Sequence, residues 1–408
     1  MRTLVLIAVL AGYFAVPQLP PARGTWPGLW GPSRNGQAVA AAPASLASAK
    51  ELWRRTSAGG YSEVVFADGR AITMELRDGA DFVVAFDGDT GRERWAARVG
   101  ATYKGHDGSD DGPIATPFID GDMVFAAGPH GVLVALDAAT GAERWRQDLV
   151  RDFGATVATW GFAYSPLVVD GRVLMATGGP KSRGLLAFDR STGRLAWSAG
   201  HAKAEGYSSP VLATIAGTPQ VIVAAGDRVY AVAPADGSLL WSLAGLGADK
   251  AIANPPIVLP GDRVLYGDWN ESVLLRITKQ GSAFSAAEAW RSTRLRAYNG
   301  ATVYRDGHLY AFAGPMLVCA DADTGEIRWR ERVGEGTLVA AGANLFLLGQ
   351  TSGDLRLVRA VPSGYAELSR ARVFTPDVRS VTGPSLAGNR MYLRNLREIV
   401  AYRWMSNP

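Results

Sequence analysis

A short acidic loop is the clearest candidate for a chemical site in this sequence. The loop runs His106-Asp-Gly-Ser-Asp-Asp-Gly-Pro113, and Asp107, Ser109 and Asp111 place oxygen-bearing side chains on alternate residues before a glycine. This spacing matches the opening of a calcium-binding loop. Phe118 stands at the twelfth position, where such a loop has a carboxylate. A calcium site and a solvated acidic turn are therefore both open interpretations.

Nucleophilic catalysis has little support, and no catalytic residue is assigned. The four histidines lie in separate segments with no marked serine or cysteine partner. The single cysteine, Cys319, lies in an apolar run and is expected to be a buried thiol. One cysteine excludes an internal disulfide, a cysteine-based zinc cluster and a c-type haem attachment motif.

A repeated segment must position any such site. The segment from Val84 to Trp95 contains the pattern Asp-x-x-Thr-Gly-x-x-x-Trp, which recurs in three further copies, with two degraded copies between them. The closing tryptophans follow in steps of 39 to 52 residues and are Trp95, Trp145, Trp197, Trp241, Trp290 and Trp329. This spacing is the period of a propeller blade.

Each copy predicts a β-hairpin. Alternating apolar residues before the Asp form one strand, and the Trp lies on the next. The Asp and Thr side chains hold the turn by bonding its backbone, and the Gly takes the positive φ that the turn needs. A Trp at the same place in every repeat can pack against the neighbouring repeat.

The strand count predicts an all-β, eight-bladed β-propeller of four-stranded blades. A second hairpin, with a turn such as Asp170-Gly171, precedes each Thr-Gly hairpin. Trp53 marks a further closing strand, and an eighth slot falls near Leu368, where Trp is missing. We expect the strand around Glu51 to Arg54 to pair with Glu398 to Arg403 and close the ring, which removes its open edges. Seven blades is the alternative count.

The N-terminus predicts export. Arg2 and the apolar stretch from Leu4 to Val16 resemble a secretory signal, and the stretch is short for a membrane span. We divide the chain into a signal peptide or N-terminal anchor (1–23), a leader arm (24–49), the propeller (50–404) and a tail (405–408). A periplasmic or cell-envelope location follows, with no integral membrane domain beyond that anchor.

A ring of polar and aromatic residues is expected at one mouth of the central channel, where the first strand of each blade begins. Its members, read from the register of the repeats, are Tyr61, Glu63, Asp111, Trp160, Phe162, Tyr207, Ser208, Asn254, Tyr298, Asn299, Glu335 and Arg379. They suit a flat polar ligand or a peptide, or else they plug the channel and satisfy the strand ends. The net charge of +4 comes without a block of Lys or Arg, so no nucleic-acid partner is expected.

From about residue 50 to 404 the chain resembles the pyrroloquinoline quinone (PQQ) repeat propellers. That group includes the quinoprotein alcohol dehydrogenases, the propeller subunit of the outer-membrane β-barrel assembly machinery, and exported propellers of unassigned role. The stretches Asp111–Pro117 and Trp160–Pro166 look most like the last group.

This chain lacks several sequence features of these relatives, which limits how much of their function the resemblance implies. The dehydrogenases have paired adjacent cysteines, and the assembly subunit has a lipidated N-terminal cysteine, whereas this chain has only Cys319. A PQQ enzyme also needs calcium and a carboxylate base. The residues available for calcium, or for stacking on the cofactor, are Asn254, Asn299, Glu205, Asp111, Trp160 and Trp269.

The favoured hypothesis is a non-catalytic exported propeller that binds an envelope protein or a polar small molecule. The alternative is a PQQ- and calcium-dependent dehydrogenase acting on an alcohol or sugar. A third hypothesis is envelope assembly through strand addition at blade edges.

Overall fold

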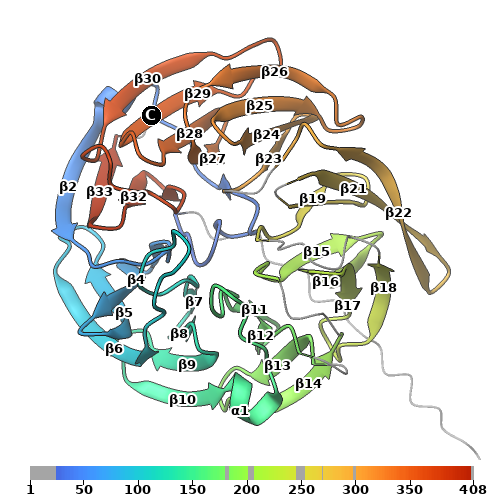
Figure 1. Ribbon diagram of the computed structural model, residues 1–408. Coiled ribbons are helices and arrows are strands. Elements are labelled where there is room, and N and C mark those ends of the chain that lie inside the picture. The colour runs from blue at the N-terminus through green and yellow to red at the C-terminus, as the bar shows by residue number, and fades with distance from the viewer. Residues whose placement is uncertain are drawn as a thin grey trace, which may run out of the picture.

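Eight antiparallel sheets stand around a central axis in the computed structural model of the chain (Figure 1). The structure describes residues 24–179, 183–200, 206–244, 253–268, 270–296 and 300–405. The expected all-β propeller and its count of eight blades are both confirmed. We number the blades 1 to 8 in chain order, starting at Val65.

Each blade has four strands that follow one another from the axis outward. In this order, blades 1 to 4 consist of β3 (Val65–Ala67), β4 (Arg70–Arg77), β5 (Ala80–Asp87) and β6 (Glu93–Ala101); β7 (Phe118–Asp120), β8 (Met123–Ala127), β9 (Val132–Asp137) and β10 (Glu143–Asp148); β11 (Leu167–Val169), β12 (Arg172–Ala176), β13 (Leu185–Asp189) and β14 (Leu195–Ala199); and β15 (Val211–Ile215), β16 (Thr218–Ala225), β17 (Arg228–Val232) and β18 (Leu239–Ala244).

Blades 5 to 8 consist of β19 (Ile257–Leu259), β20 (Arg263–Gly267), β21 (Ser272–Gln280) and β22 (Ala283–Ser292); β23 (Val303–Arg305), β24 (His308–Ala313), β25 (Met316–Asp321) and β26 (Ile327–Arg332); β27 (Gly336–Ala341), β28 (Asn344–Gly349), β29 (Asp354–Arg359) and β30 (Glu367–Arg372); and β31 (Ser385–Ala387), β32 (Arg390–Arg394), β33 (Glu398–Trp404) and β2 (Ala49–Thr56).

Three short elements complete the described chain: β1 (Gln37–Ala38), the 3₁₀ helix η1 (Leu46–Ser48) and α1 (Leu149–Phe153). None of the helices in the described residues is long and apolar enough to cross a bilayer.

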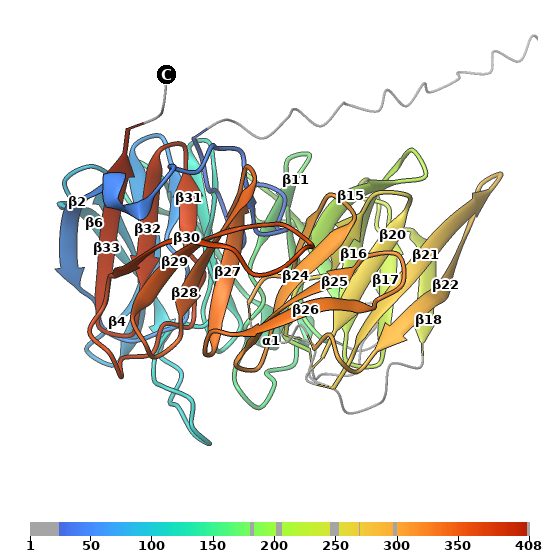
Figure 2. The same ribbon diagram turned by 90° about the horizontal axis from the view of Figure 1, so that it is seen from above.

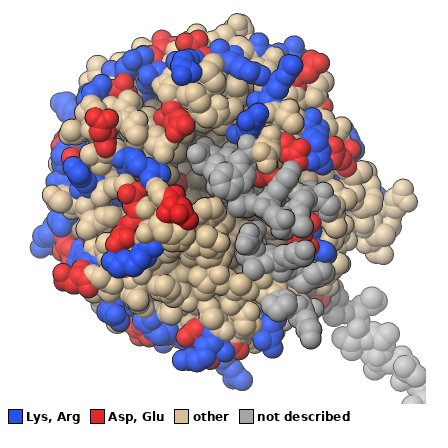
Figure 3. Space-filling view, in the orientation of Figure 1, with Lys and Arg blue, Asp and Glu red and all other residues tan. Residues whose placement is uncertain are grey.

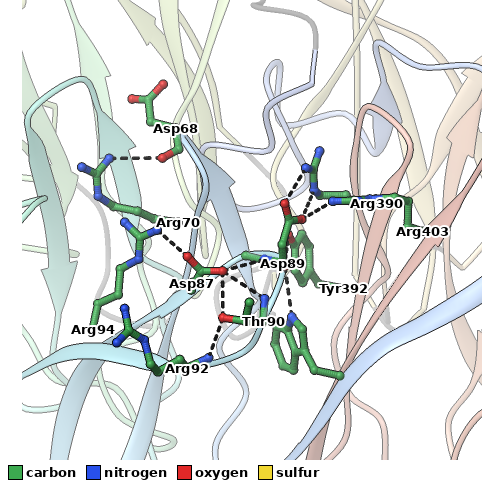
Figure 4. A network of polar contacts seen from close by, with 12 residues as sticks. Asp68, Arg70, Asp87, Asp89, Thr90, Arg92, Arg94, Arg390, Tyr392 and Arg403 are labelled. Atoms are coloured by element: carbon green, nitrogen blue, oxygen red, sulfur yellow. Dashed lines mark hydrogen bonds and ion pairs between the residues drawn. The ribbon is translucent and has the colours of Figure 1, made fainter.

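The Thr-Gly turn is built as the repeat predicts. In blade 1, the Asp87 carboxylate accepts hydrogen bonds from the backbone N–H of Asp89 (3.2 Å) and Thr90 (3.0 Å) and from the Thr90 hydroxyl (2.9 Å), and Gly91 has φ +67° (Figure 4). This is an Asx turn whose last residue must adopt a left-handed conformation. The same carboxylate bonds recur at Asp137, Asp189 and Asp321.

The outer-strand tryptophans join neighbouring blades. The Trp95 indole N–H donates to the Ala138 carbonyl in the turn of blade 2 (3.1 Å), and the ring lies directly against Gly141 of that turn. Equivalent indole-to-carbonyl bonds are Trp53 to Gly88, Trp145 to Arg190, Trp197 to Pro234, Trp290 to Ala322 and Trp329 to Val361. In blade 4, Trp241 donates instead to Gln220 of its own blade (2.7 Å). The expected role of the repeated Trp is therefore confirmed, with this one variation.

The two ends of the chain close the ring in blade 8. Strand β2 pairs antiparallel with β33, with Glu51 opposite Tyr402 and Arg54 opposite Val400, as expected from the two incomplete ends. The seam to blade 1 carries charge, because Asp89 accepts from Arg390 (2.7 Å) and also pairs with Arg403 (Figure 4). A cluster of buried apolar residues from blades 1, 7 and 8 lies beneath these ion pairs.

The missing Trp of blade 7 has a structural counterpart. The strand register places Ser369 opposite Leu357, which is the Trp position of the other blades. Between β33 and β2 there is no Thr-Gly turn for a Trp to contact, because different parts of the chain supply these strands. Helix η1 takes this place instead: the Leu46 N–H donates to the Ser369 hydroxyl (2.9 Å), and the Leu46 side chain is buried.

We predict that Gly141→Ala destabilises the fold much more than Gly69→Ala. The two glycines have nearly the same φ, +74° and +73°, so the cost of a left-handed alanine, about 1 kcal/mol, is common to both. A Cβ at Gly141 would lie 2.6 Å from the Trp95 ring, whereas nothing lies within 4 Å of one at Gly69. Overpacking at Gly141 should add about 1–3 kcal/mol, measured by urea denaturation. Equal losses in the two variants would show that the contact with Trp95 does not constrain this position.

Candidate functional site

The segment from Gly24 to Ser48, which we call the N-terminal arm, packs on one face of the propeller. Trp26 and Phe66 exchange two backbone hydrogen bonds of 2.8 Å, and the Pro27 carbonyl accepts from Ile119 (2.8 Å). Further on, β1 pairs parallel with β27 of blade 7. We expected this segment to be a leader preceding the folded part. Instead it crosses the propeller from blades 1 and 2 to blade 7 and buries Trp26, Trp30 and Arg34 (Figure 2).

Arg34 is buried against the inner ends of blades 2 to 4. Its side chain is 2% exposed, and its guanidinium donates to the carbonyls of Ser165 (3.2 Å), Pro166 and Pro210 (3.0 Å) at the inner ends of blades 3 and 4. The guanidinium carbon lies 5.9 Å from the centre of the Phe118 ring. Burial lowers the pKa of Arg34 to about 9, so the side chain stays charged at neutral pH. Several carbonyl oxygens thus take the place of water around a buried cation.

Glu63 is the buried carboxylate that faces the arm. Its side chain accepts hydrogen bonds from the Trp30 backbone N–H (3.0 Å) and the Trp26 indole N–H (3.4 Å). Burial raises the pKa of Glu63 to about 7, opposed by these bonds and by the charge of Arg34. The carboxylate therefore helps to seat the arm in the channel.

The channel remains open toward the opposite face, where it forms a cavity of about 520 Å³. Aromatic rings, hydroxyl groups and two amides line it, together with Glu63 and Arg379; the main contributors are Trp30, Tyr61, Glu63, Tyr103, Thr116, Trp160, Ser165, Tyr207, Asn254, Gln350 and Arg379. Trp160 and Tyr207 form a pair with ring centres 5.9 Å apart, and the backbone N–H of Trp160 donates to the Tyr207 hydroxyl (3.2 Å). Basic and acidic side chains are interspersed around the hollow on this face (Figure 3).

The acidic loop lies over the rim of this cavity and protrudes from the face opposite the arm (Figure 2). Arg379 of the β30–β31 connection donates to the Gly108 carbonyl (2.9 Å) and pairs with Asp110 (3.0 Å). The Asp110 N–H donates to the Tyr61 hydroxyl (2.6 Å). On the other side, both His106 ring nitrogens face oxygens, one on Asp107 and one on the Thr159 carbonyl, and these contacts raise the pKa of His106. The loop is thus held from two sides.

The three residues proposed as calcium ligands point to different partners. Asp111 accepts from Lys104 (2.8 Å) and from the Gly105 N–H (2.8 Å), and the Ser109 hydroxyl donates to the His106 carbonyl (2.6 Å). Asp107 contacts His106 (3.1 Å). Within the described ranges, no group of three or more His, Cys, Asp or Glu side chains could hold a metal ion.

The structure brings together half of the predicted ring. Six of its members line the cavity: Tyr61, Glu63, Trp160, Tyr207, Asn254 and Arg379. Asp111 lies on the exposed loop, Phe162 and Ser208 are fully buried, and Glu335 lines a neighbouring groove. Tyr298 and Asn299 lie outside the described residues, as do Glu205 and Trp269. The sequence analysis did not predict three other residues that line the cavity, Trp30, Tyr103 and Gln350. The two closely spaced tryptophans Trp26 and Trp30 were the one sequence feature that could have indicated a buried arm.

The described residues do not fit a PQQ and calcium site. Calcium takes six to eight oxygen ligands, several of them carboxylates. The cavity offers one described carboxylate from its inner wall, Glu63, which is already bonded by Trp26 and Trp30. Asp107, at the rim, is paired with His106.

The family described as outer membrane protein assembly factor BamB matches residues 34–127, 79–282 and 279–402 of the chain. The quinohemoprotein alcohol dehydrogenase ADH IIB of Pseudomonas putida is 34% identical over 126 residues, which cover 28% of this chain and 17% of that enzyme. The chain thus matches less than a fifth of the length of this relative.

Two solved structures share the fold. BamB from Moraxella catarrhalis superposes with a TM-score of 0.63 and 16% identity, covering 88% of this chain and 99% of that one. The quinohemoprotein alcohol dehydrogenase from Comamonas testosteroni superposes with a TM-score of 0.67 and 15% identity, covering 95% of this chain and 82% of that one. At these identities the similarity shows the fold alone.

We predict that Glu63→Gln flattens the pH dependence of stability. Because the pKa of Glu63 is raised from 4.5 to about 7 in the folded state, the folded protein keeps a proton that the unfolded chain releases. The free energy of unfolding of the wild type therefore falls as pH rises from about 4.5 to about 7. Because glutamine cannot ionise, this fall should be about 3 kcal/mol smaller in the variant Glu63→Gln.

Urea denaturation between about pH 5 and pH 8 measures this difference. Asp81, whose pKa burial raises to about 6, adds a dependence of the same sign, so wild type and variant must be compared at each pH. Parallel curves for the two proteins would show that Glu63 is ionised throughout this range in the folded state.

Proposed function

The chain belongs to the family of outer membrane protein assembly factor BamB, and from this premise we propose that it is a non-catalytic binding protein of the cell envelope. Its binding site is the cavity at the open end of the channel. The occupant is a segment of an envelope protein or a polar small molecule.

The observation that carries this proposal is the way in which the channel is closed. Trp30 and Arg34 of the arm are buried against the inner ends of the blades, and Glu63 is used to hold the arm there. Beside them is a cavity of about 520 Å³ whose described walls are mainly aromatic and hydroxyl-bearing. Pockets of this size and composition bind through shape and a few oriented polar groups.

The N-terminus supports an envelope location. Arg2 followed by the apolar stretch Leu4–Val16 is typical of an export signal, which we assign to residues 1–23 as a cleaved signal peptide or an anchor. The arm follows directly, so export and closure of the channel are served by adjoining segments of the chain.

The alternative function is that of a PQQ- and calcium-dependent dehydrogenase. The partial match to ADH IIB and the shared propeller fold favour it. The burial of Glu63, which is 2% exposed and holds the arm through Oε2, counts against it, because a general base must reach the substrate proton.

We predict that PQQ at saturating concentration, with or without calcium, leaves the thermal unfolding midpoint of the mature protein unchanged. A ligand that binds only the folded state raises this midpoint in proportion to its affinity. A calcium-dependent rise would favour the dehydrogenase, and oxidation of alcohols and sugars with an artificial electron acceptor would then be assayed.

A second prediction concerns the binding face. A photo-reactive phenylalanine analogue in place of Trp160 should cross-link a partner in intact cells, because this residue is half-buried at the cavity wall. The matched control is the same analogue at Leu239, which is 61% exposed on the outer strand β18. Equal adducts at both positions, or an adduct at Leu239 alone, would contradict binding at the channel mouth.

A further inference from the structure

A second recess lies beside the channel mouth, between blades 6 and 7. This groove has a volume of about 460 Å³ and is lined by Thr293, Arg294, Arg296, Phe312, Ala313, Gly314, Pro315, Met316, Val318, Arg330, Glu335, Gly336 and Gln350. Gly336 and Gln350 also line the channel cavity, so the two recesses adjoin. An extended occupant can therefore reach from one into the other.

The floor of the groove is apolar. Phe312 and Val318 are buried, while Ala313, Pro315 and Met316 are partly exposed in the turn between β24 and β25. Gly336 keeps the floor in place, because a Cβ there would lie 2.5 Å from the Leu348 carbonyl and 3.0 Å from the Phe312 ring. A flexible Met beside an aromatic ring suits an apolar side chain of variable shape.

The rim of the groove is basic. Arg294, Arg296 and Arg330 are all exposed, and in the described part of the chain none of them has an acidic partner within ion-pairing distance. Arg296 is held by a bond from its Nε to the Thr293 carbonyl (2.8 Å). In contrast, Arg328, two residues before Arg330 on β26, is paired with Asp321 (2.7 Å). The rim also carries one acid, Glu335, so its described side chains sum to a formal charge of +2.

Such a recess selects its ligand by two features together. Exposed guanidinium groups recognise carboxylates through paired, charge-assisted hydrogen bonds. The apolar floor contributes to the free energy of binding only when an apolar side chain of the ligand replaces water on it. A ligand that satisfies both carries several carboxylates around a hydrophobic anchor.

We propose that this groove binds an acidic segment of a protein partner, with an apolar side chain on the Phe312–Met316 floor and carboxylates on Arg294, Arg296 and Arg330. A polypeptide is the occupant because the groove continues into the channel cavity through Gly336 and Gln350. The inference rests on the proposed binding function but concerns a separate set of side chains.

The test uses the mature full-length protein and a panel of fluorescein-labelled peptides of about eight residues. Each peptide carries Asp and Glu around Leu, Ile or Phe, and each has a counterpart with Asn and Gln in place of the acids. Fluorescence anisotropy should show binding of at least one acidic peptide, and its amide counterpart should bind about tenfold more weakly or not at all.

The variant Arg294→Glu/Arg330→Glu should weaken this binding by at least about tenfold. The matched control is Arg92→Glu/Arg194→Glu, which makes the same charge change at exposed arginines in the turns of blades 1 and 3, away from the groove, and should change affinity less than about threefold. Thermal unfolding of both variants checks that they are folded.

Three outcomes would overturn the proposal: no acidic peptide of the panel binds, the amide counterparts bind equally well, or both double variants lose affinity alike. A Trp160→Ala variant separates this site from the channel. If it abolishes binding while Arg294→Glu/Arg330→Glu does not, the groove proposal fails and the channel-mouth function stands.

Discussion

The contact between an outer-strand tryptophan and the next blade's turn, made by six tryptophans of the described chain, is the interaction on which the ring depends. An indole ring lies flat against a turn glycine while its N–H bonds the carbonyl three residues before it, as Trp95 does with Gly141 and Ala138. The contact combines a large apolar burial with a directional bond, so it fixes both the distance and the angle between blades. It also explains why a turn far from any site requires glycine for two reasons, its φ and its lack of a side chain.

The same contact accounts for the irregular part of the ring. Blade 7 has Ser369 in place of Trp because blade 8 is assembled from both ends of the chain and offers no turn to receive an indole. The arm supplies Leu46 at that position, and its earlier part buries Arg34 against the inner ends of blades 3 and 4. Closing the ring and closing the channel are therefore done by one continuous segment, and this segment defines which end of the channel can receive a ligand.

Much of the fold was predictable because it repeats. Four copies of one turn predicted where the strands reverse direction. The incomplete repeats at Trp53 and Tyr402 predicted that the first and last strands pair and close the ring. The arm was not predictable in this way, because Trp26 and Arg34 make contacts that occur once and join residues more than 30 positions apart. Only half of the candidate ring lines the cavity, for a related reason. In a loop before a strand, a shift of one residue exchanges a cavity-lining side chain such as Tyr207 for a buried one such as Ser208.

The pairing of β2 with β33 has a consequence for how the chain reaches its folded state. Strand β2 is made early in synthesis and has no partner until residues after Glu398 exist. Its pairing spans almost the whole polypeptide, so the loop that must close is nearly the full length of the chain. Until that moment blade 8 lacks β33 and β2 has no strand to pair with, so the ring is open between blades 7 and 1. The ring therefore closes only once Glu398–Trp404 has been made, whereas the four radial strands of each other blade come from one continuous stretch of the chain.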